Sequence, residues 1–133
     1  MVFIMMNKIK KTLFLLFLST QLFALDIYDD IANSIRSGDA RQLAVFFGNT
    51  IDLQIIDQEN VYSKAQAELI LKDFFIKNQP KSFTILHKGS SPEGTQYVIG
   101  NLTTTKGKSF RTSFHLKTIN GRSVLQELRI ENK

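Results

Sequence analysis

The sequence predicts an α+β fold in which helices come first and a run of antiparallel strands follows. Apolar residues recur every three to four positions in the first half of the chain and every second position after Pro80. Asn120-Gly121 is the strongest short hairpin signal available to a sequence. No repeat, linker or low-complexity tract interrupts residues 25–133, so we expect one domain with the element order ααβαββββ.

Two helices are predicted at the start of this domain. Asp26 can cap the first, whose apolar residues recur at a spacing of four, and Ser37-Gly38 ends it. Asp39 and Gln42 form a capping box for a short second helix, which Gly48-Asn49 stops. The apolar sides of these helices are Ile27, Ile31 and Ile35, and then Leu43, Phe46 and Phe47.

A strand from Thr50 to Ile56 follows, because apolar and polar residues alternate there. Ser63 and Gln66 then form a second capping box, and a long helix runs from Lys64 to about Asn78. Pro80 ends this helix. Its inward side is predicted to carry Ala67, Ile70, Leu71, Phe74 and Phe75.

Four consecutive strands are predicted after Pro80, joined by hairpin turns. Ser90–Gly94, Lys106–Lys108 and Asn120-Gly121 supply the turns between them. Such a sheet has one apolar face, and the long helix is the only predicted element long enough to cover it. We therefore expect a curved antiparallel sheet wrapped on one long helix, in the shape of a cone with a potential pocket at its wide end.

Residues 1–24 are predicted to be a secretory signal peptide. Lys8, Lys10 and Lys11 precede an apolar run from Thr12 to Ala24, which is shorter than the roughly 20 residues that a membrane-spanning helix needs. We expect cleavage after Ala24 and a mature domain of residues 25–133 in the periplasm or outside the cell. An uncleaved anchor is the alternative, and either Met1 or Met6 can be the start.

Composition argues against several classes of partner. The three lysines of the leader belong to the 17 basic residues, whereas all 12 acidic residues follow Ala24, so the formal charge of +5 falls to +2 for residues 25–133. The remaining basic residues are scattered, so we expect no nucleic-acid partner, and no membrane partner after cleavage. The chain has no cysteine, which excludes disulfides, thiolate zinc sites and lipid attachment through a cysteine.

The element order resembles that of the nuclear transport factor 2-like superfamily, which includes ketosteroid isomerase and scytalone dehydratase. The segment Val61-Tyr-Ser-Lys-Ala-Gln-Ala-Glu-Leu-Ile-Leu-Lys-Asp-Phe-Phe75 is similar to the hallmark helix of a secreted bacterial family of unknown function, found mostly in Bacteroidetes. Phe83–Gly89, Tyr97–Leu102 and Leu125–Ile130 also fit. The resemblance covers the mature chain, and it implies a fold and an exported location but no established activity.

The isomerase-like relatives use an Asp base with a Tyr and a neutral acid inside the cone. No carboxylate occupies a predicted inward strand position here, and Glu127 and Glu131 fall on the opposite face. A base could come only from His87 or from a helix or loop acid such as Asp57. The predicted inward positions are Phe83, Ile85, His87, Tyr97, Ile99, Phe110, Thr112, Phe114, Leu116, Val124, Gln126, Leu128 and Ile130. We assign no catalytic residue.

His87 and His115 are the only histidines, and strand phase predicts that they point apart. A zinc site with two histidines still needs a further ligand such as a carboxylate, so we assign no metal and no cofactor.

Two candidate surfaces remain. The candidate cone lining is Phe74, Phe83, His87, Tyr97, Phe110, Phe114 and Gln126. The candidate interface on the opposite face is Arg111, His115, Glu127 and Arg129. We expect an exported, non-catalytic domain, monomeric or a modest homodimer, that binds a small apolar ligand or an envelope protein. Alternatives are an isomerase, dehydratase or hydrolase acting in the same cavity, and a solid cone whose polar sheet face is the working surface.

Overall fold

The computed structural model describes residues 27–133, so the predicted signal peptide lies outside the described residues. The chain divides into two units, Met1–Asp30 and Ile31–Lys133, and the sheet and the core belong to the second. Residues 27–37 are helical and cross this boundary. Within residues 27–133, no helix is both long and apolar enough to cross a membrane.

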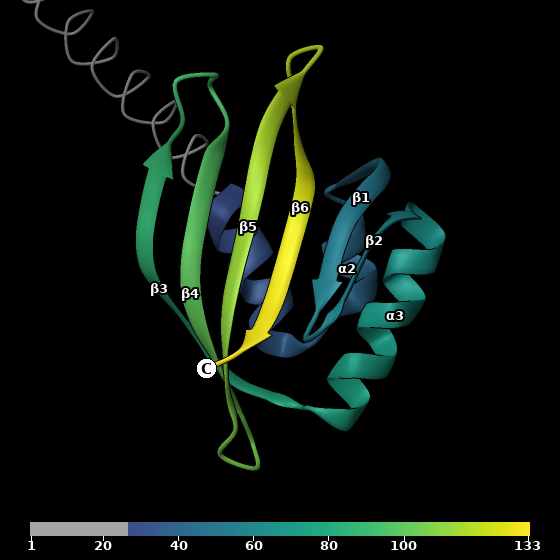
Figure 1. The fold of residues 1–133 in the computed structure, drawn as a ribbon, viewed down its shortest axis with the longest axis vertical. Helices are drawn as coiled ribbons and strands as arrows, with labels where there is room; N and C mark the ends of the chain where they lie inside the picture. Colours follow the sequence, from purple (N-terminus) through teal and green to yellow (C-terminus); the bar gives the residue numbers. More distant parts are fainter. Residues whose placement is uncertain (1–26) are drawn as a thin grey trace, which may run out of the picture. The chain divides into compact units, whose positions relative to one another are not determined.

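Six strands form one curved sheet in the order β2-β1-β6-β5-β4-β3, as Figure 1 shows. Every neighbouring pair is antiparallel except β1 and β6, which run parallel. The strands are β1 (Phe47–Ile55), β2 (Gln58–Ser63), β3 (Pro80–Ser90), β4 (Gln96–Thr104), β5 (Ser109–Ile119) and β6 (Arg122–Asn132).

The predicted α+β class is confirmed, but two details of the sheet are wrong. The sheet is mixed, because the early strand β1 joins the late strand β6 in parallel. An extra strand, β2, changes the described order to ααββαββββ. The segment Gln58–Ser63 has no alternation of polar and apolar residues because it is an edge strand with mostly exposed side chains. Its pairing with β1 therefore left no periodic signal.

The short second helix, α2 (Ala40–Ala44), ends earlier than predicted. Asp39 caps it as expected, and its Oδ1 accepts a hydrogen bond from the Gln42 amide at 3.0 Å. The helix ends at Ala44 because the next residues pair with β6: the Leu125 amide donates a hydrogen bond to the Phe46 carbonyl at 2.8 Å. Phe47 and Gly48-Asn49 consequently lie in β1.

The long helix, α3 (Lys64–Lys77), confirms the prediction and its cap. The Gln66 amide donates to Ser63 Oγ at 3.2 Å, and Gln66 Oε1 accepts from the Ser63 amide at 3.2 Å. The helix packs against α2, β1 and β2. It reaches the centre of the sheet through Phe74, whose ring meets that of Phe110 edge to face at 5.3 Å.

Two hairpin turns place a residue other than glycine in left-handed backbone. Asn120 and Gly121 have φ of 52° and 73° and join β5 to β6, as predicted. The turn between β1 and β2 contains Ile56 at φ 58°, a conformation that a β-branched residue rarely adopts. The Ile56 amide donates to the Ile130 carbonyl at 2.7 Å, so contact with β6 holds this strained turn in place.

Candidate functional site

The sheet has an inner face, which carries Phe110 and faces α3, and an outer face on the opposite side. Residues paired in register lie on the same face. Phe110, Thr112 and Phe114 pair with Leu102, Gly100 and Val98, and all six positions are buried. The structure therefore brings the predicted lining residues Phe74, Phe83, Phe110 and Phe114 together on the inner side and buries all four.

The prediction that Tyr97 points inward is wrong. Tyr97 pairs with His115 on the outer face, and Ile99 shares that face through its pairing with Ser113. Both alternating sets of β4 are largely apolar, so the pattern alone could not distinguish the two phases. Gly100 is the residue that could have indicated which set points inward. A Cβ there would lie 2.6 Å from Cζ of Phe83, because that ring fills the space on the inner side of Gly100.

His87 is also on the outer face, contrary to the prediction. A register shift between Ile85 and His87 changes the phase of β3, so that His87 pairs with Ile99. Its Nε2 lies 3.3 Å from the Tyr97 hydroxyl. The Tyr97 ring lies over Gly89, where a Cβ would come within 2.4 Å of the ring.

Gln126 is displaced by a similar irregularity in β6. His115 pairs with Glu127 and Leu116 with Leu125, which leaves Gln126 unpaired between them. Its side chain lines a groove on the outer face rather than the inner side. The bulge shows as a break in the alternation of buried residues, because Leu125 and Leu128 lie three positions apart whereas Leu128 and Ile130 lie two apart.

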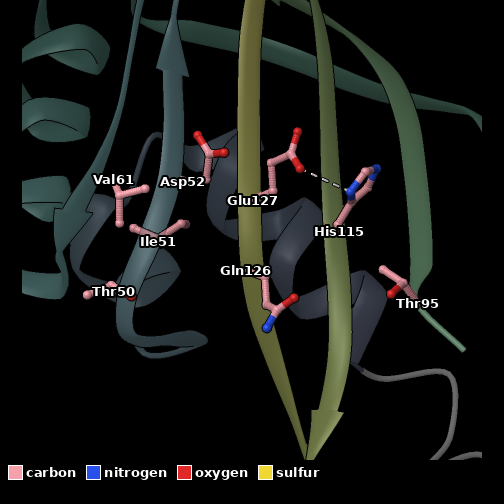
Figure 2. Close-up of a pocket in the computed structure, with 8 residues that line it drawn as sticks. All are labelled: Thr50, Ile51, Asp52, Val61, Thr95, His115, Gln126 and Glu127. Carbon is pink, nitrogen blue, oxygen red and sulfur yellow. Dashed lines mark ion pairs between the residues drawn. The ribbon is translucent and has the colours of Figure 1, made fainter. Parts of the chain in front are cut away.

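The outer face holds an open groove of about 380 Å³ at the junction of β1 and β6 (Figure 2). Its lining residues come from β1, β2, β5 and β6 and from the turn before β4. They are Thr50, Ile51, Asp52, Val61, Thr95, His115, Gln126 and Glu127.

One register row crosses the sheet through this groove. Tyr97, His115, Glu127, Asp52 and Val61 are successive pairing partners on five neighbouring strands. The wall of the groove is thus built on the rigid sheet rather than on loops, so its side chains are held in fixed relative positions.

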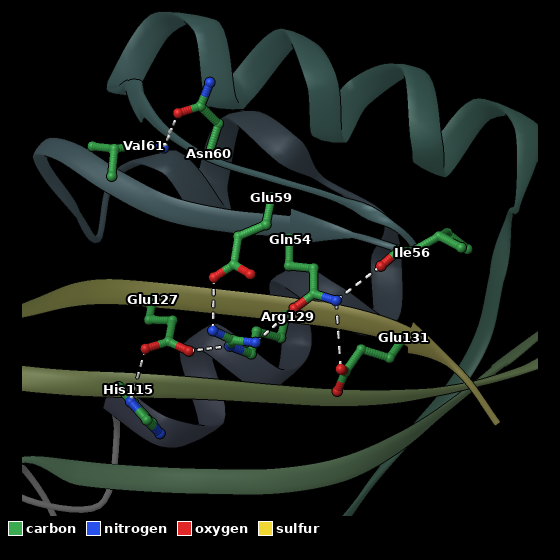
Figure 3. A network of polar contacts seen from close by, with 9 residues as sticks. All are labelled: Gln54, Ile56, Glu59, Asn60, Val61, His115, Glu127, Arg129 and Glu131. Atoms are coloured by element: carbon green, nitrogen blue, oxygen red, sulfur yellow. Dashed lines mark hydrogen bonds and ion pairs between the residues drawn. The ribbon is translucent and has the colours of Figure 1, made fainter.

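Arg129 organises the polar contacts beside the groove, as Figure 3 shows. Its Nε donates to Glu127, Nη1 donates to Gln54 Oε1 at 2.6 Å, and Nη2 pairs with Glu59 at 2.7 Å. The other oxygen of Glu127 lies 3.2 Å from Nδ1 of His115. Arg129 therefore fixes the Glu127 carboxylate, and Glu127 in turn orients the His115 ring toward the groove.

The carboxylates around Arg129 also set its electrostatics. The hydrogen bond to Glu127 raises the pKa of Arg129 above its usual value, and the charges of Glu127, Glu59 and Asp52 act in the same direction. Burial opposes them by favouring the neutral form. The guanidinium therefore stays charged.

Of the four predicted interface residues, the structure brings His115, Glu127 and Arg129 together. Arg111 lies on the same face of β5, further along the strand than His115, and pairs with Asn101 and Glu131. Its side chain is exposed. It makes no hydrogen bond or ion pair with the described residues. Sequence analysis missed Gln54 and Glu59, which reach this network from β1 and β2.

The inner side offers little chemistry in the described part of the chain. The buried polar side chains between residues 27 and 133 are Ser34, Thr104 and Thr112, and none carries a carboxyl group. The same residues contain no group of three or more His, Asp or Glu side chains placed to hold a metal ion.

Known proteins with this fold fall into natural and designed groups. A DUF4783 protein from Bacteroides ovatus is 26% identical, with 78% of this chain and 93% of that chain covered and a TM-score of 0.72. One from Bacteroides uniformis is 24% identical, covering 79% and 95%, with a TM-score of 0.73. The designed NTF2-like protein Rd1NTF2_05 is 14% identical, covering 81% and 96%, with a TM-score of 0.65. No curated protein matches the chain.

The resemblance inferred from Val61–Phe75 and the element order is therefore confirmed for the fold, which is that of nuclear transport factor 2. The pattern of the DUF4783 family, a domain of unknown function, matches residues 28–131. This match spans most of the sequence, and the chain belongs to the DUF4783 family.

Proposed function

We propose that this protein is an exported, non-catalytic binding module that captures an envelope protein through the groove on the outer face of its sheet. The observation that carries this proposal is the network in which Arg129 fixes Glu127 and Glu127 orients His115. Polar side chains ordered in this way on a rigid sheet are preorganised for recognition, which lowers the entropy cost of binding.

The absence of buried carboxyl groups among the described residues favours binding over proton-transfer chemistry. The His115–Glu127 pair lies in an open groove instead of an enclosed site, and open grooves suit macromolecular partners better than small substrates. The location proposed for the partner rests on the predicted signal peptide, since a signal peptide directs a chain out of the cytoplasm.

Site-specific photo-crosslinking in cells that naturally make the protein tests the proposal. A benzophenone side chain is introduced at Val61, which is 61% exposed at the groove. The matched control carries it at Ile76 on α3, which is 72% exposed and lies away from the outer face. We expect one discrete protein adduct at Val61, weakened by Arg129→Gln, and none at Ile76. An adduct at Ile76 alone, or no adduct at Val61, contradicts the proposal.

Export has a separate test. N-terminal sequencing of the protein from the same cells should give Leu25 as the first residue, in the soluble envelope fraction. A chain that retains its leader and sediments with membranes would instead support the uncleaved anchor.

A second candidate function is the binding of a small apolar ligand on the inner side of the sheet. It is favoured by Thr112, which is 0% exposed and whose Oγ1 has no hydrogen-bond partner among residues 27–133. A buried hydroxyl without a partner is costly, and a ligand atom could satisfy it. Phe110 and Phe114 flank it on the same strand.

Native mass spectrometry of the protein from its natural source tests this candidate. A ligand would appear as a fixed mass increment, and Thr112→Val should reduce its occupancy while keeping the shape of the side chain. An unliganded mass in the wild-type protein would remove the candidate.

A further inference from the structure

We infer that the groove binds a basic segment of the partner protein, and that Asp52 accepts the lysine ammonium or arginine guanidinium group. The inference rests on the proposed function, because it names the partner chemistry for the same groove.

Asp52 differs from the other acidic residues of the outer face in its polar contacts. Glu59 is paired with Arg129, Glu127 with Arg129 and His115, and Glu131 accepts from Gln54 Nε2 at 3.5 Å. The Asp52 carboxylate makes no hydrogen bond or ion pair with any described residue, although it is half-buried in the groove wall. A partly desolvated carboxylate gains from a cationic partner, since a charge-assisted hydrogen bond replaces lost hydration.

Arg129, the cation of the network, is not available to bind an incoming anion. Arg129 donates from Nε, Nη1 and Nη2 to three different side chains, so each of its nitrogens is already engaged. The Nδ1 atom of His115 is directed at Glu127. The groove therefore presents the Asp52 carboxylate to a charged group, because it makes no hydrogen bond or ion pair with a described residue, although its charge also acts on Arg129.

Local charge has the opposite sign from the whole chain. Asp52, Glu59, Glu127 and Glu131 share the β2-β1-β6 part of the outer face with Arg129, and Arg111 lies one strand away. This region is acidic, although residues 25–133 together carry a formal net charge of +2. A basic segment is thus attracted to the groove while the rest of the protein repels it.

The dimensions of the groove suit one long basic side chain. Val61 offers an apolar surface in register with Asp52, and Thr50 and Gln126 add hydrogen-bonding groups nearby. A lysine can lay its methylene stem along Val61 while its ammonium reaches Asp52. The volume of about 380 Å³ has room for such a side chain but not for a folded element.

Fluorescence anisotropy with labelled octalysine tests this inference on the full chain, with a neutral Gly-Ser octamer and octaglutamate as control peptides. We expect octalysine alone to bind, more weakly at high salt. Asp52→Asn should weaken it about tenfold, the effect of losing one charge-assisted contact. Asp52→Glu should restore most of the affinity. The matched control is Asp73→Asn on α3, which removes the same charge from an exposed site paired with Lys77 and should change affinity less than twofold.

Two results would overturn the inference: octalysine fails to bind, or Asp73→Asn weakens binding as much as Asp52→Asn does. Melting temperatures of the variants show whether each is folded. If the Val61 crosslink persists while octalysine fails, the groove still captures a partner but its chemistry is not basic. Loss of the Val61 crosslink instead removes the proposed function itself.

Discussion

The two faces of the sheet use the same strands for different purposes. On β5, Phe110 and Phe114 point to the inner face and are fully buried, whereas His115 points to the outer face and remains partly exposed. The inner face has apolar contacts that exclude water, and the outer face has charged contacts that water reaches. Stability and recognition should therefore be separable by mutating neighbouring residues of one strand.

The largest expected effect comes from removing an inner ring. Phe110→Ala should lower the free energy of unfolding by about 3–5 kcal/mol, because Phe110 is fully buried and its ring contacts Phe74. Urea denaturation measures the change. The matched variant Ser113→Ala on the outer face of β5 should cost less than about 0.5 kcal/mol. Equal losses would mean that the two faces do not differ in this way.

Two glycines compare the faces directly. Gly100→Ala places a Cβ 2.6 Å from Phe83 Cζ and 2.7 Å from the Thr84 carbonyl oxygen, so the inner face must rearrange and about 1–3 kcal/mol should be lost. The three atoms nearest to the Cβ of Gly89→Ala all belong to the hydroxyl end of the Tyr97 ring, which can swing into solvent. We expect little change in melting temperature for Gly89→Ala but a clear shift of the Tyr97 and His87 ring signals in NMR spectra.

Thr112→Val, also on the inner face, is expected to raise stability, whereas the preceding inner-face variants lower it. The substitution removes a buried hydroxyl that has no hydrogen-bond partner among the described residues, and it keeps the side-chain shape. The ligand-free protein should therefore gain about 1 kcal/mol. Thermal or urea unfolding measures the gain. A loss of stability would mean that the hydroxyl has a partner in solution, such as a bound molecule.

The smallest effect is expected at Arg129. Arg129→Gln should cost about 0.5 kcal/mol, since its ion pairs with Glu59 and Glu127 are partly exposed. The cost should shrink at high salt. Because the folded-state pKa of Arg129 is raised, its contribution is complete below the ordinary arginine pKa and is lost only as the pH rises through the folded value. Unfolding measured at neutral and mildly alkaline pH should therefore show the same difference between Arg129→Gln and the wild type.

The sequence was sufficient for elements whose signal is local. The Ser63–Gln66 capping box and the Asn120-Gly121 turn are short-range features, and both lie where the pattern predicts. Burial of Phe74, Phe83, Phe110 and Phe114 also followed from periodicity. These predictions needed no knowledge of distant parts of the chain.

The candidate site depended on long-range features that a pattern does not contain. Irregular pairing after Ile85 and at Gln126 moved side chains to the outer face, and the phase of Tyr97 was ambiguous. The Arg129–Gln54 contact joins residues 75 positions apart. Only the observed register shows that Asp52 lies beside Glu127.

The parallel pairing of β1 with β6 has a consequence for the order of folding. The hairpins of β3 to β6 join strands that are neighbours in the chain, whereas β1 and β6 are separated by a long intervening segment. Closing such a loop carries an entropy cost, so we expect the β1–β6 pair to form later than the hairpins. The groove follows this seam. A chain that has completed its hairpins but not this seam would lack the proposed recognition surface, so binding of the proposed partner would report that the last step of assembly has occurred.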